Sequence, residues 1–129
     1  HKDLIEALIR VKDSFNSYPI DRFAEAGATA AMQDKAYFEQ TCEKVMATRA
    51  ALVKGLQTLD FEVLPSGANF VFAKHKTHDG AELTKNLRDK NIIIRHFKKP
   101  ARIAPYLRIT IGTDIQSKQL LDALTAILK

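Results

Sequence analysis

A long, uninterrupted helical pattern that leads directly into short strand-like segments most constrains how this chain can fold. Between residues 35 and 59, apolar side chains recur at alternating intervals of four and three positions, the spacing of one helix face. This face consists of Phe38, Cys42, Val45, Leu52, Leu56 and Leu59. No proline interrupts the segment, and its single glycine weakens a helix without ending it. Such a helix is roughly 36 Å long, enough to cross a whole domain or join two.

The pattern changes after residue 60, and the rest of the chain mixes strands and helices. The expected strands are 61–64, 69–73, 91–97 and 106–111. Capping-box spacing starts two further helices, at Asp79 with Glu82 and at Thr113 with Gln116. Before residue 35, segments 2–12 and 20–33 also have helical patterns, and the alanines of 20–33 predict close packing against other helices. The order predicts an α+β fold: a small mixed or antiparallel sheet with helices on one face, plus the long helix.

Composition narrows the class of protein further. With 129 residues, 46% of them hydrophobic, the chain is expected to form one domain and is too apolar for disorder. No apolar run approaches the roughly 20 residues of a membrane span. The single cysteine, Cys42, suits a reducing compartment and is expected to be a buried, inert thiol. The first residue is His1, without a signal-peptide pattern, so we expect a piece of a longer protein.

Two arginines are the best candidates for recognition chemistry. In the expected strand 106–111, Arg108 lies on the face opposite the aliphatic residues, in the middle of a rigid element. A guanidinium there can hold a carboxylate or phosphate through two parallel hydrogen bonds. Arg95, near the end of the preceding strand, can approach the same region. The alternative is a surface arginine paired with a neighbour in the sheet.

Other reactive side chains give weaker indications of a functional site. His75, His78 and Asp79 lie at a strand end and in a turn, and no fourth ligand is evident, so we expect an exposed loop and no metal site. The net charge is +5, but acids are interspersed with most of the basic residues. Only segment 95–102 is locally basic, and it favours a solvated or anion-facing loop.

Four segments in order resemble one family. They are 11–19 (VKDSFNSYP), 65–72 (PSGANFVF), 94–95 (IR) and 107–113 (LRITIGT). The pattern resembles the C-terminal part of histidinol-phosphate aminotransferases, within the fold-type I, pyridoxal-phosphate-dependent class I/II aminotransferases. The resemblance implies that the chain is a C-terminal fragment of a two-domain enzyme. Segment 1–34 then joins the two domains, and 35–129 is the small domain with the long helix leading into it.

The same resemblance assigns roles to individual residues. Arg108 matches the arginine that binds the substrate carboxylate and, in histidinol-phosphate enzymes, the substrate phosphate. Arg95 matches a second arginine at the phosphate end, and Asn16 and Tyr18 border the active site in relatives. Asn69 is expected to be structural.

The resemblance also implies what the chain lacks and what it joins. No catalytic residue is expected within the chain, because the cofactor lysine lies upstream; Lys44 has the right spacing but lies on the solvated side of the long helix. Pyridoxal 5'-phosphate belongs to the parent enzyme, with none bound to this chain alone. The expected partners are the large domain, an anionic substrate and a second subunit of a cytoplasmic homodimer, with no nucleic acid and no membrane.

Two alternatives stay open at this point. The parent is a histidinol-phosphate enzyme or another class I/II aminotransferase of the aromatic or aspartate type. From a different class, the chain is a standalone basic α+β module that binds RNA, with Gly67 to Phe72 faintly similar to an RNA-recognition strand. Against it, aromatic residues are few and basic residues are not expected to gather on one strand face, so no base-stacking platform is expected.

Overall fold

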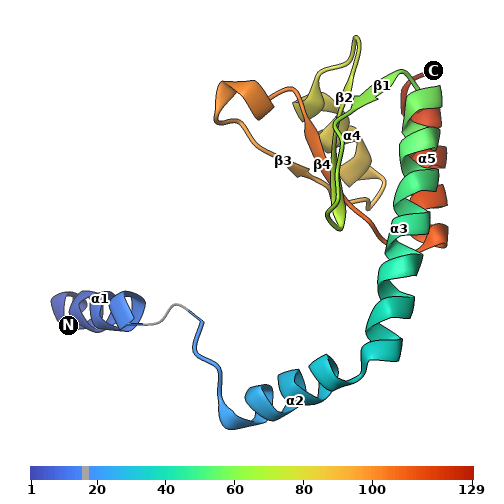
Figure 1. Ribbon diagram of the computed structural model, residues 1–129. Coiled ribbons are helices and arrows are strands. Elements are labelled where there is room, and N and C mark those ends of the chain that lie inside the picture. Colours follow the sequence, from blue (N-terminus) through green and yellow to red (C-terminus); the bar gives the residue numbers. More distant parts are fainter. Residues whose placement is uncertain (16–17) are drawn as a thin grey trace. The chain divides into compact units, whose positions relative to one another are not determined.

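The structure, a computed structural model, describes residues 1–15 and 18–129. The chain forms two compact units, His1–Glu39 and Gln40–Lys129. The first contains helices α1 (Lys2–Phe15) and α2 (Arg22–Gln33) and the start of α3 (Lys35–Thr58) (Figure 1). Asp21 caps α2 by accepting a hydrogen bond from the Ala24 amide. Within the described residues α2 buries none of its side chains, so the close packing predicted from its alanines is not observed.

The second unit is built around a four-stranded sheet. Its strands are β1 (Phe61–Val63), β2 (Phe70–His75), β3 (Arg95–His96) and β4 (Leu107–Thr110). The strand order is β1-β2-β4-β3, and every neighbouring pair is antiparallel. The predicted α+β fold with a small antiparallel sheet is therefore confirmed.

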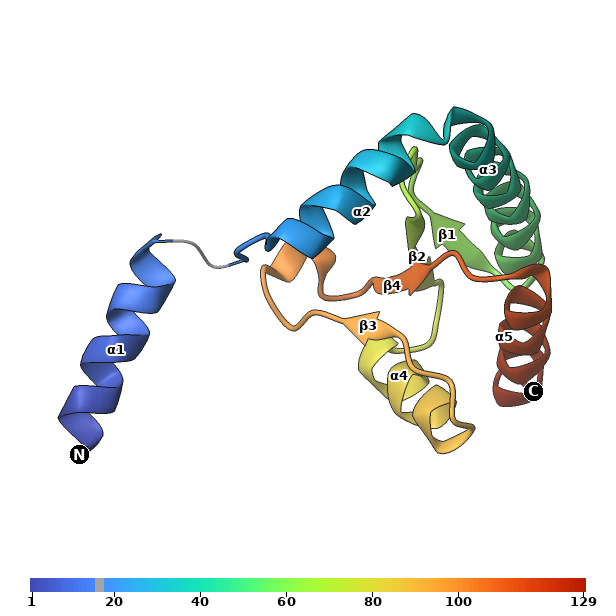
Figure 2. The ribbon, with the colours of Figure 1, turned by 90° about the horizontal axis from the view of Figure 1, so that it is seen from below.

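One face of this sheet forms the core with three helices. Alternation along β2 and β4 places Val71, Ala73, Leu107 and Ile109 on the buried face. In Figure 2, α3, α4 (Gly80–Asp89) and α5 (Asp114–Ile127) lie on that side of the sheet. The core side chains contributed by the helices are Leu52, Leu56, Leu83, Leu87, Leu120 and Leu124. The helices thus pack on one face, as the sequence predicted.

Close approach of α3 and α5 depends on a glycine. A Cβ atom built on Gly55 would lie 2.5 Å from Leu121 Cδ1, closer than side-chain carbons pack. The residue that weakens the long helix therefore also makes room for its neighbour. Thr48, buried on α3, ties the same two helices together by donating a 2.6 Å hydrogen bond to Asp114 Oδ1.

The long helix is present at its predicted position, but only its C-terminal half is buried. Leu52 and Leu56 are inaccessible, whereas Phe38 is 61% exposed. The expectation of a buried Cys42 is wrong, because its side chain is partly exposed. Arg49, in the polar gap of the helix face, donates a 2.7 Å hydrogen bond to the Ala68 carbonyl and so anchors the β1–β2 turn.

The strand predicted over 91–97 is much shorter than expected. Only Arg95 and His96 pair with β4, and no other residue of that segment belongs to a strand. Ile94 is buried and Ile92 packs against the core, while Ile93 is 75% exposed. The isoleucine run therefore reflects packing of Ile92 and Ile94 against the core, in a segment that is not hydrogen-bonded to β4 as a strand.

The two predicted capping boxes have different outcomes. At the start of α5, Thr113 and Gln116 make both reciprocal hydrogen bonds, which confirms the box. At α4, the Asp79 side chain accepts hydrogen bonds from the amides of Ala81 and Glu82, without the reciprocal bond from the Glu82 side chain. Across the ranges 1–15 and 18–129, no helix is both long and apolar enough to cross a membrane.

Candidate anion-binding site

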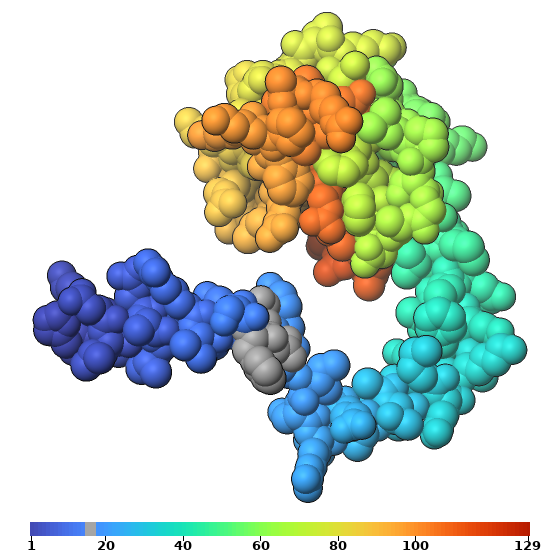
Figure 3. Space-filling view, turned by 60° about the vertical axis from the view of Figure 1, so that its left-hand side comes forward, coloured from blue at the N-terminus to red at the C-terminus, as the bar shows by residue number. Residues whose placement is uncertain are grey.

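The face of the sheet turned away from α3, α4 and α5, here called the open face, gathers charged and aromatic side chains. In Figure 3 the red-orange atoms of β4 lie between the orange segment near residue 100 and the yellow-green atoms of β2. Strand alternation places on this face the side chains that are out of phase with the core. The charged and aromatic ones are Glu62, Phe70, Phe72, Lys74, Arg95 and Arg108, and Tyr106, just before β4, packs against Phe72 beside them.

Arg108 lies at the centre of the open face. In the strand register it is opposite Phe72 on β2 and opposite Arg95 on β3. Its guanidinium carbon lies 4.2 Å from the centre of the Phe70 ring. Its Nε atom is buried and has no hydrogen-bond partner within the described part of the chain. The alternative of an arginine paired with a neighbour in the sheet is met by the Phe70 ring alone, because Arg108 forms no ion pair with a described residue.

Arg95 lies directly opposite Arg108 in the strand register, in agreement with its predicted place near the end of the preceding strand. It is exposed, on the two-residue edge strand β3. It also lines a shallow hollow between α4 and β3, together with Lys85, Arg88 and Lys98. None of these four cations takes part in an ion pair with a described residue. The edge of the sheet is therefore positively charged and free to accept an anion.

The other two expected site residues belong to the first unit. Tyr18 is 89% exposed, between α1 and α2. Asn16 lies outside the described residues. Their role beside the active site stays a prediction.

A second cluster on the open face holds the carboxylate that could otherwise neutralise Arg108. Lys74 Nζ lies 2.9 Å from Glu62 Oε2, and the Tyr106 hydroxyl donates to Glu62 Oε1 at 3.2 Å. The hydrogen bond from Lys74, followed by that from Tyr106, lowers the pKa of Glu62. The same hydrogen bond with Glu62 raises the pKa of Lys74. Glu62 is thus held as an anion by Lys74 and Tyr106.

The strand residues do not by themselves fit pyridoxal phosphate, the cofactor implied by the resemblance. That cofactor needs a lysine for its aldehyde and a polar partner for its ring nitrogen. Lys74 is the one lysine in the four strands, and its ion pair and raised pKa oppose the neutral amine that such a role requires. Lys44 is exposed on α3. We therefore assign no cofactor contact to these residues.

The aromatic side chains of the open face were missed by the sequence reasoning. Phe70 and Phe72 lie edge to face with centroids 5.8 Å apart, and Phe72 and Tyr106 do so at 6.4 Å. The expectation that basic residues do not gather on one strand face is wrong, because Lys74, Arg95 and Arg108 share the open face with these rings. Strand phase could have grouped Phe70 with Phe72, but their contact with Arg108 depends on the register between β2 and β4.

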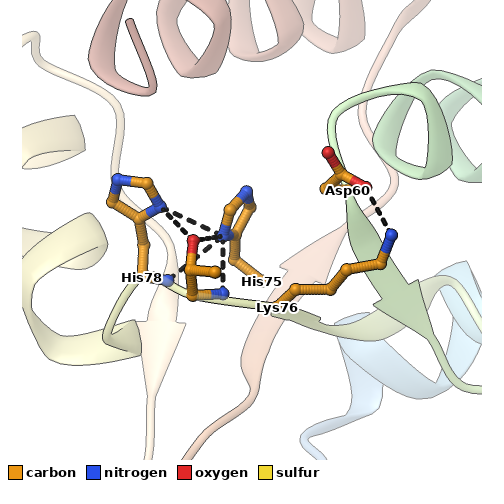
Figure 4. A network of polar contacts seen from close by, with 5 residues as sticks. Asp60, His75, Lys76 and His78 are labelled. Atoms are coloured by element: carbon orange, nitrogen blue, oxygen red, sulfur yellow. Dashed lines mark hydrogen bonds and ion pairs between the residues drawn. The ribbon is translucent and has the colours of Figure 1, made fainter.

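The turn after β2 brings the two predicted histidines together (Figure 4). His75 Nδ1 accepts hydrogen bonds from the backbone amides of Thr77 and His78, both at 3.1 Å. His78 Nδ1 also lies 3.1 Å from His75 Nδ1. Asp79 is occupied in capping α4. The described residues contain no cluster of three or more histidine, cysteine or acidic side chains placed to hold a metal ion.

This turn is expected to make the stability of the second unit depend on pH. Burial, and then the nearby charge of His78, lower the pKa of His75. The unfolded chain therefore binds more protons than the folded one as pH falls below about 6.5, and the folded state loses stability there. His75→Asn keeps an acceptor oxygen near the position of Nδ1 and removes the titration. Urea unfolding at a series of pH values should show a smaller acid loss in this variant.

The matched control is His1→Asn, which changes an exposed histidine in the other unit. It should keep the acid loss of the unmodified chain. If His75→Asn and the unmodified chain lose stability equally on acidification, His75 does not carry the effect.

The fold and the open face first define a class of protein, an α+β domain that can bind an anion on its sheet. The chain contains an α+β domain with two arginines, neither in an ion pair with a described residue, on the open face of a four-stranded antiparallel sheet. The particular family follows from comparison with known proteins: the chain belongs to the aminotransferase class I and II family, whose pattern matches residues 1–124.

Individual relatives agree with this assignment. The chain is 64% identical over 124 residues to histidinol-phosphate aminotransferase 2 of Thiobacillus denitrificans, covering 96% of this chain and 35% of that protein. Identity to histidinol-phosphate aminotransferase 1 of Pseudomonas aeruginosa is 58% over 124 residues, with the same coverage of 96% and 35%. The chain therefore spans about 35% of the length of these relatives.

A solved structure agrees in fold. The histidinol-phosphate aminotransferase from Sinorhizobium meliloti, in complex with pyridoxal-5'-phosphate, matches with a TM-score of 0.77 and 23% identity. The match covers 92% of this chain and 33% of that one. This match shows the fold, and the family membership implied by the four sequence segments is confirmed by the family pattern over residues 1–124.

Proposed function

We propose that this chain forms the small-domain part of a pyridoxal-phosphate-dependent histidinol-phosphate aminotransferase. The reaction is histidinol phosphate plus 2-oxoglutarate giving imidazole acetol phosphate plus glutamate, a step of histidine biosynthesis. The names of the two relatives described above support this substrate. In this proposal residues 1–34 join the two domains, residues 35–129 form the small domain, and the whole enzyme is a cytoplasmic homodimer.

The position of Arg95 opposite Arg108 on the neighbouring strand is the observation that supports the substrate class. The two residues are opposite each other on neighbouring strands, and neither has an acidic partner among the described residues. A phosphate monoester carries a charge of about −1.5 to −2 at neutral pH, so it can neutralise both guanidinium groups, whereas a carboxylate neutralises one. A phosphorylated amino donor therefore suits the pair better than an aromatic or aspartate donor.

The chain's residues supply binding and orientation. The cofactor, held by the remainder of the enzyme, would carry the amino group between the two substrates. Arg108 would bind the substrate anion through two parallel hydrogen bonds, with Arg95 on its far side, and so fix the direction in which the substrate lies. No residue described here is assigned a proton-transfer role, and the chain alone should not transaminate.

A chimera tests the proposal. The 129-residue chain replaces the matching region of the Thiobacillus denitrificans relative, to which it is 64% identical. The chimera should transaminate histidinol phosphate with a kcat/KM within about tenfold of the unmodified relative and at least 100-fold above that for aspartate or phenylalanine, since losing contact with a charged group costs about 2–5 kcal/mol. The isolated chain should show no turnover.

The control is the unmodified relative, assayed with the same three donors. A soluble chimera that prefers aspartate or an aromatic donor would replace the substrate assignment with one of the other class I/II activities. A soluble chimera with no transamination would contradict the enzymatic role of the chain.

A further inference from the structure

The guanidinium of Arg108 is placed without any of the partners that usually orient an arginine. Its buried Nε makes no hydrogen bond within the described residues. The carboxylate on the same face, Glu62, is bound by Lys74 and Tyr106. Arg95, directly opposite, repels Arg108. Polar contacts therefore do not explain how the planar group is held.

The ring of Phe70 is the group against which the guanidinium rests. The guanidinium carbon lies 4.2 Å from the ring centre, well within the range of a cation–π contact. Phe70 is diagonal to Arg108 across the β2–β4 pair, since Phe70 is opposite Thr110 and Phe72 is opposite Arg108. Diagonal neighbours on one sheet face are within reach of aromatic and long side chains.

Phe70 is itself fixed by its surroundings. Its ring packs edge to face against Phe72, with centroids 5.8 Å apart and planes at 89°. Its carbonyl accepts a 2.6 Å hydrogen bond from the Ser66 hydroxyl, which also accepts one from the Ala68 amide. Arg49 holds the same turn by donating to the Ala68 carbonyl. The ring is thus a rigid support on the first residue of β2.

We propose that Phe70 is a positioning residue that sets the plane of the Arg108 guanidinium, so that the terminal amino groups are presented to the substrate anion in advance. This inference rests on the proposed function of Arg108 and adds a second residue to it. A guanidinium held in one orientation loses less conformational freedom on binding, which strengthens binding of the anion. Phe70 would touch neither the substrate nor the cofactor.

The first test is independent of catalysis. In the 129-residue chain, the Nε–H proton of Arg108 should resonate upfield of other arginine Nε–H protons, because it lies near the Phe70 ring. Phe70→Leu should return the signal to the ordinary range, and Phe70→Tyr should keep it shifted. A signal at the ordinary position in the unmodified chain would overturn the inference, whatever the enzyme's activity.

The second test separates binding from turnover in the chimera. Phe70→Leu should raise the KM for histidinol phosphate about fivefold to tenfold, as loss of a partly desolvated cation–π contact implies, with kcat changed less than twofold. The separate variant Phe70→Tyr, which keeps an aromatic ring at this position, should have the KM of the unmodified chimera. The matched control is Phe97→Leu, because Phe97 contacts Phe72 and has no ring contact with Arg108.

The outcomes distinguish the two proposals. If Arg108→Ala raises KM but Phe70→Leu does not, Phe70 has no positioning role and the proposed function stands. If Arg108→Ala leaves KM unchanged, the proposed function of Arg108 fails, and the positioning of an anion by Phe70 fails with it. Equal effects of Phe70→Leu and Phe97→Leu on KM would mean general loosening of the face, and would also overturn the inference.

Discussion

Replacing Arg108 by alanine in the chimera is expected to raise the KM for histidinol phosphate by roughly 100-fold or more. Removing one member of a desolvated, hydrogen-bonded charge pair costs about 2–5 kcal/mol, and each 1.4 kcal/mol is about a factor of ten in affinity. The guanidinium makes no ion pair with a described residue, so its terminal amino groups are available to the substrate. Steady-state kinetics with histidinol phosphate as the varied substrate measures the change.

Lys54→Ala provides the matched control for this prediction. Lys54 lies on α3, is exposed and does not belong to the open face. Its removal subtracts the same charge from the domain and should change KM less than twofold. A KM that stays unchanged in Arg108→Ala would remove Arg108 from the substrate site.

Replacing Leu56 by alanine is expected to lower the free energy of unfolding of the second unit by about 2–5 kcal/mol. Leu56 is fully buried on α3, in the cluster shared by the sheet, α4 and α5. Truncation removes apolar contacts and leaves a cavity that a close-packed core fills only in part. Urea denaturation of the 129-residue chain, followed by far-ultraviolet circular dichroism, measures the loss as a lower midpoint with an unchanged slope.

Ile93→Ala is the control for Leu56. Ile93 is 75% exposed in the segment where the sequence predicted a strand. Exposed positions usually tolerate substitution within about 0.5 kcal/mol, so this variant should unfold close to the unmodified chain. A loss below about 1 kcal/mol for Leu56→Ala would mean that α3 is not a principal part of the core.

Features of the fold that depend only on residues near each other in the sequence were predictable. The length of α3 follows from a continuous periodicity without proline, and the start of α5 follows from the paired hydrogen-bonding capacity of Thr113 and Gln116. The phase of β4 likewise follows from alternation, which placed Arg108 opposite the aliphatic face before any partner strand was known.

What depends on distant partners could not be predicted in this way. Helical periodicity describes a face but not which half of the helix meets a neighbour, so Phe38 and Cys42 were expected to be more buried than they are. Three isoleucines indicate an apolar environment, but they do not reveal that the pairing with β4 is limited to Arg95 and His96. Register, which one strand cannot reveal, decides that Phe70 supports Arg108.

The pairing of β3 with β4 has a consequence for the edge of the sheet. β3 has only two residues, and one of them, Arg95, faces Arg108 with the same charge, an arrangement that disfavours the pairing. In the proposed site, a dianion between the two guanidinium groups turns this repulsion into attraction on both strands. Binding and local folding are then thermodynamically linked, because a ligand stabilises the state that binds it. Bound substrate would stabilise the pairing of β3 with β4. Any change that weakens this pairing would therefore weaken substrate binding, even at a residue that does not contact the substrate.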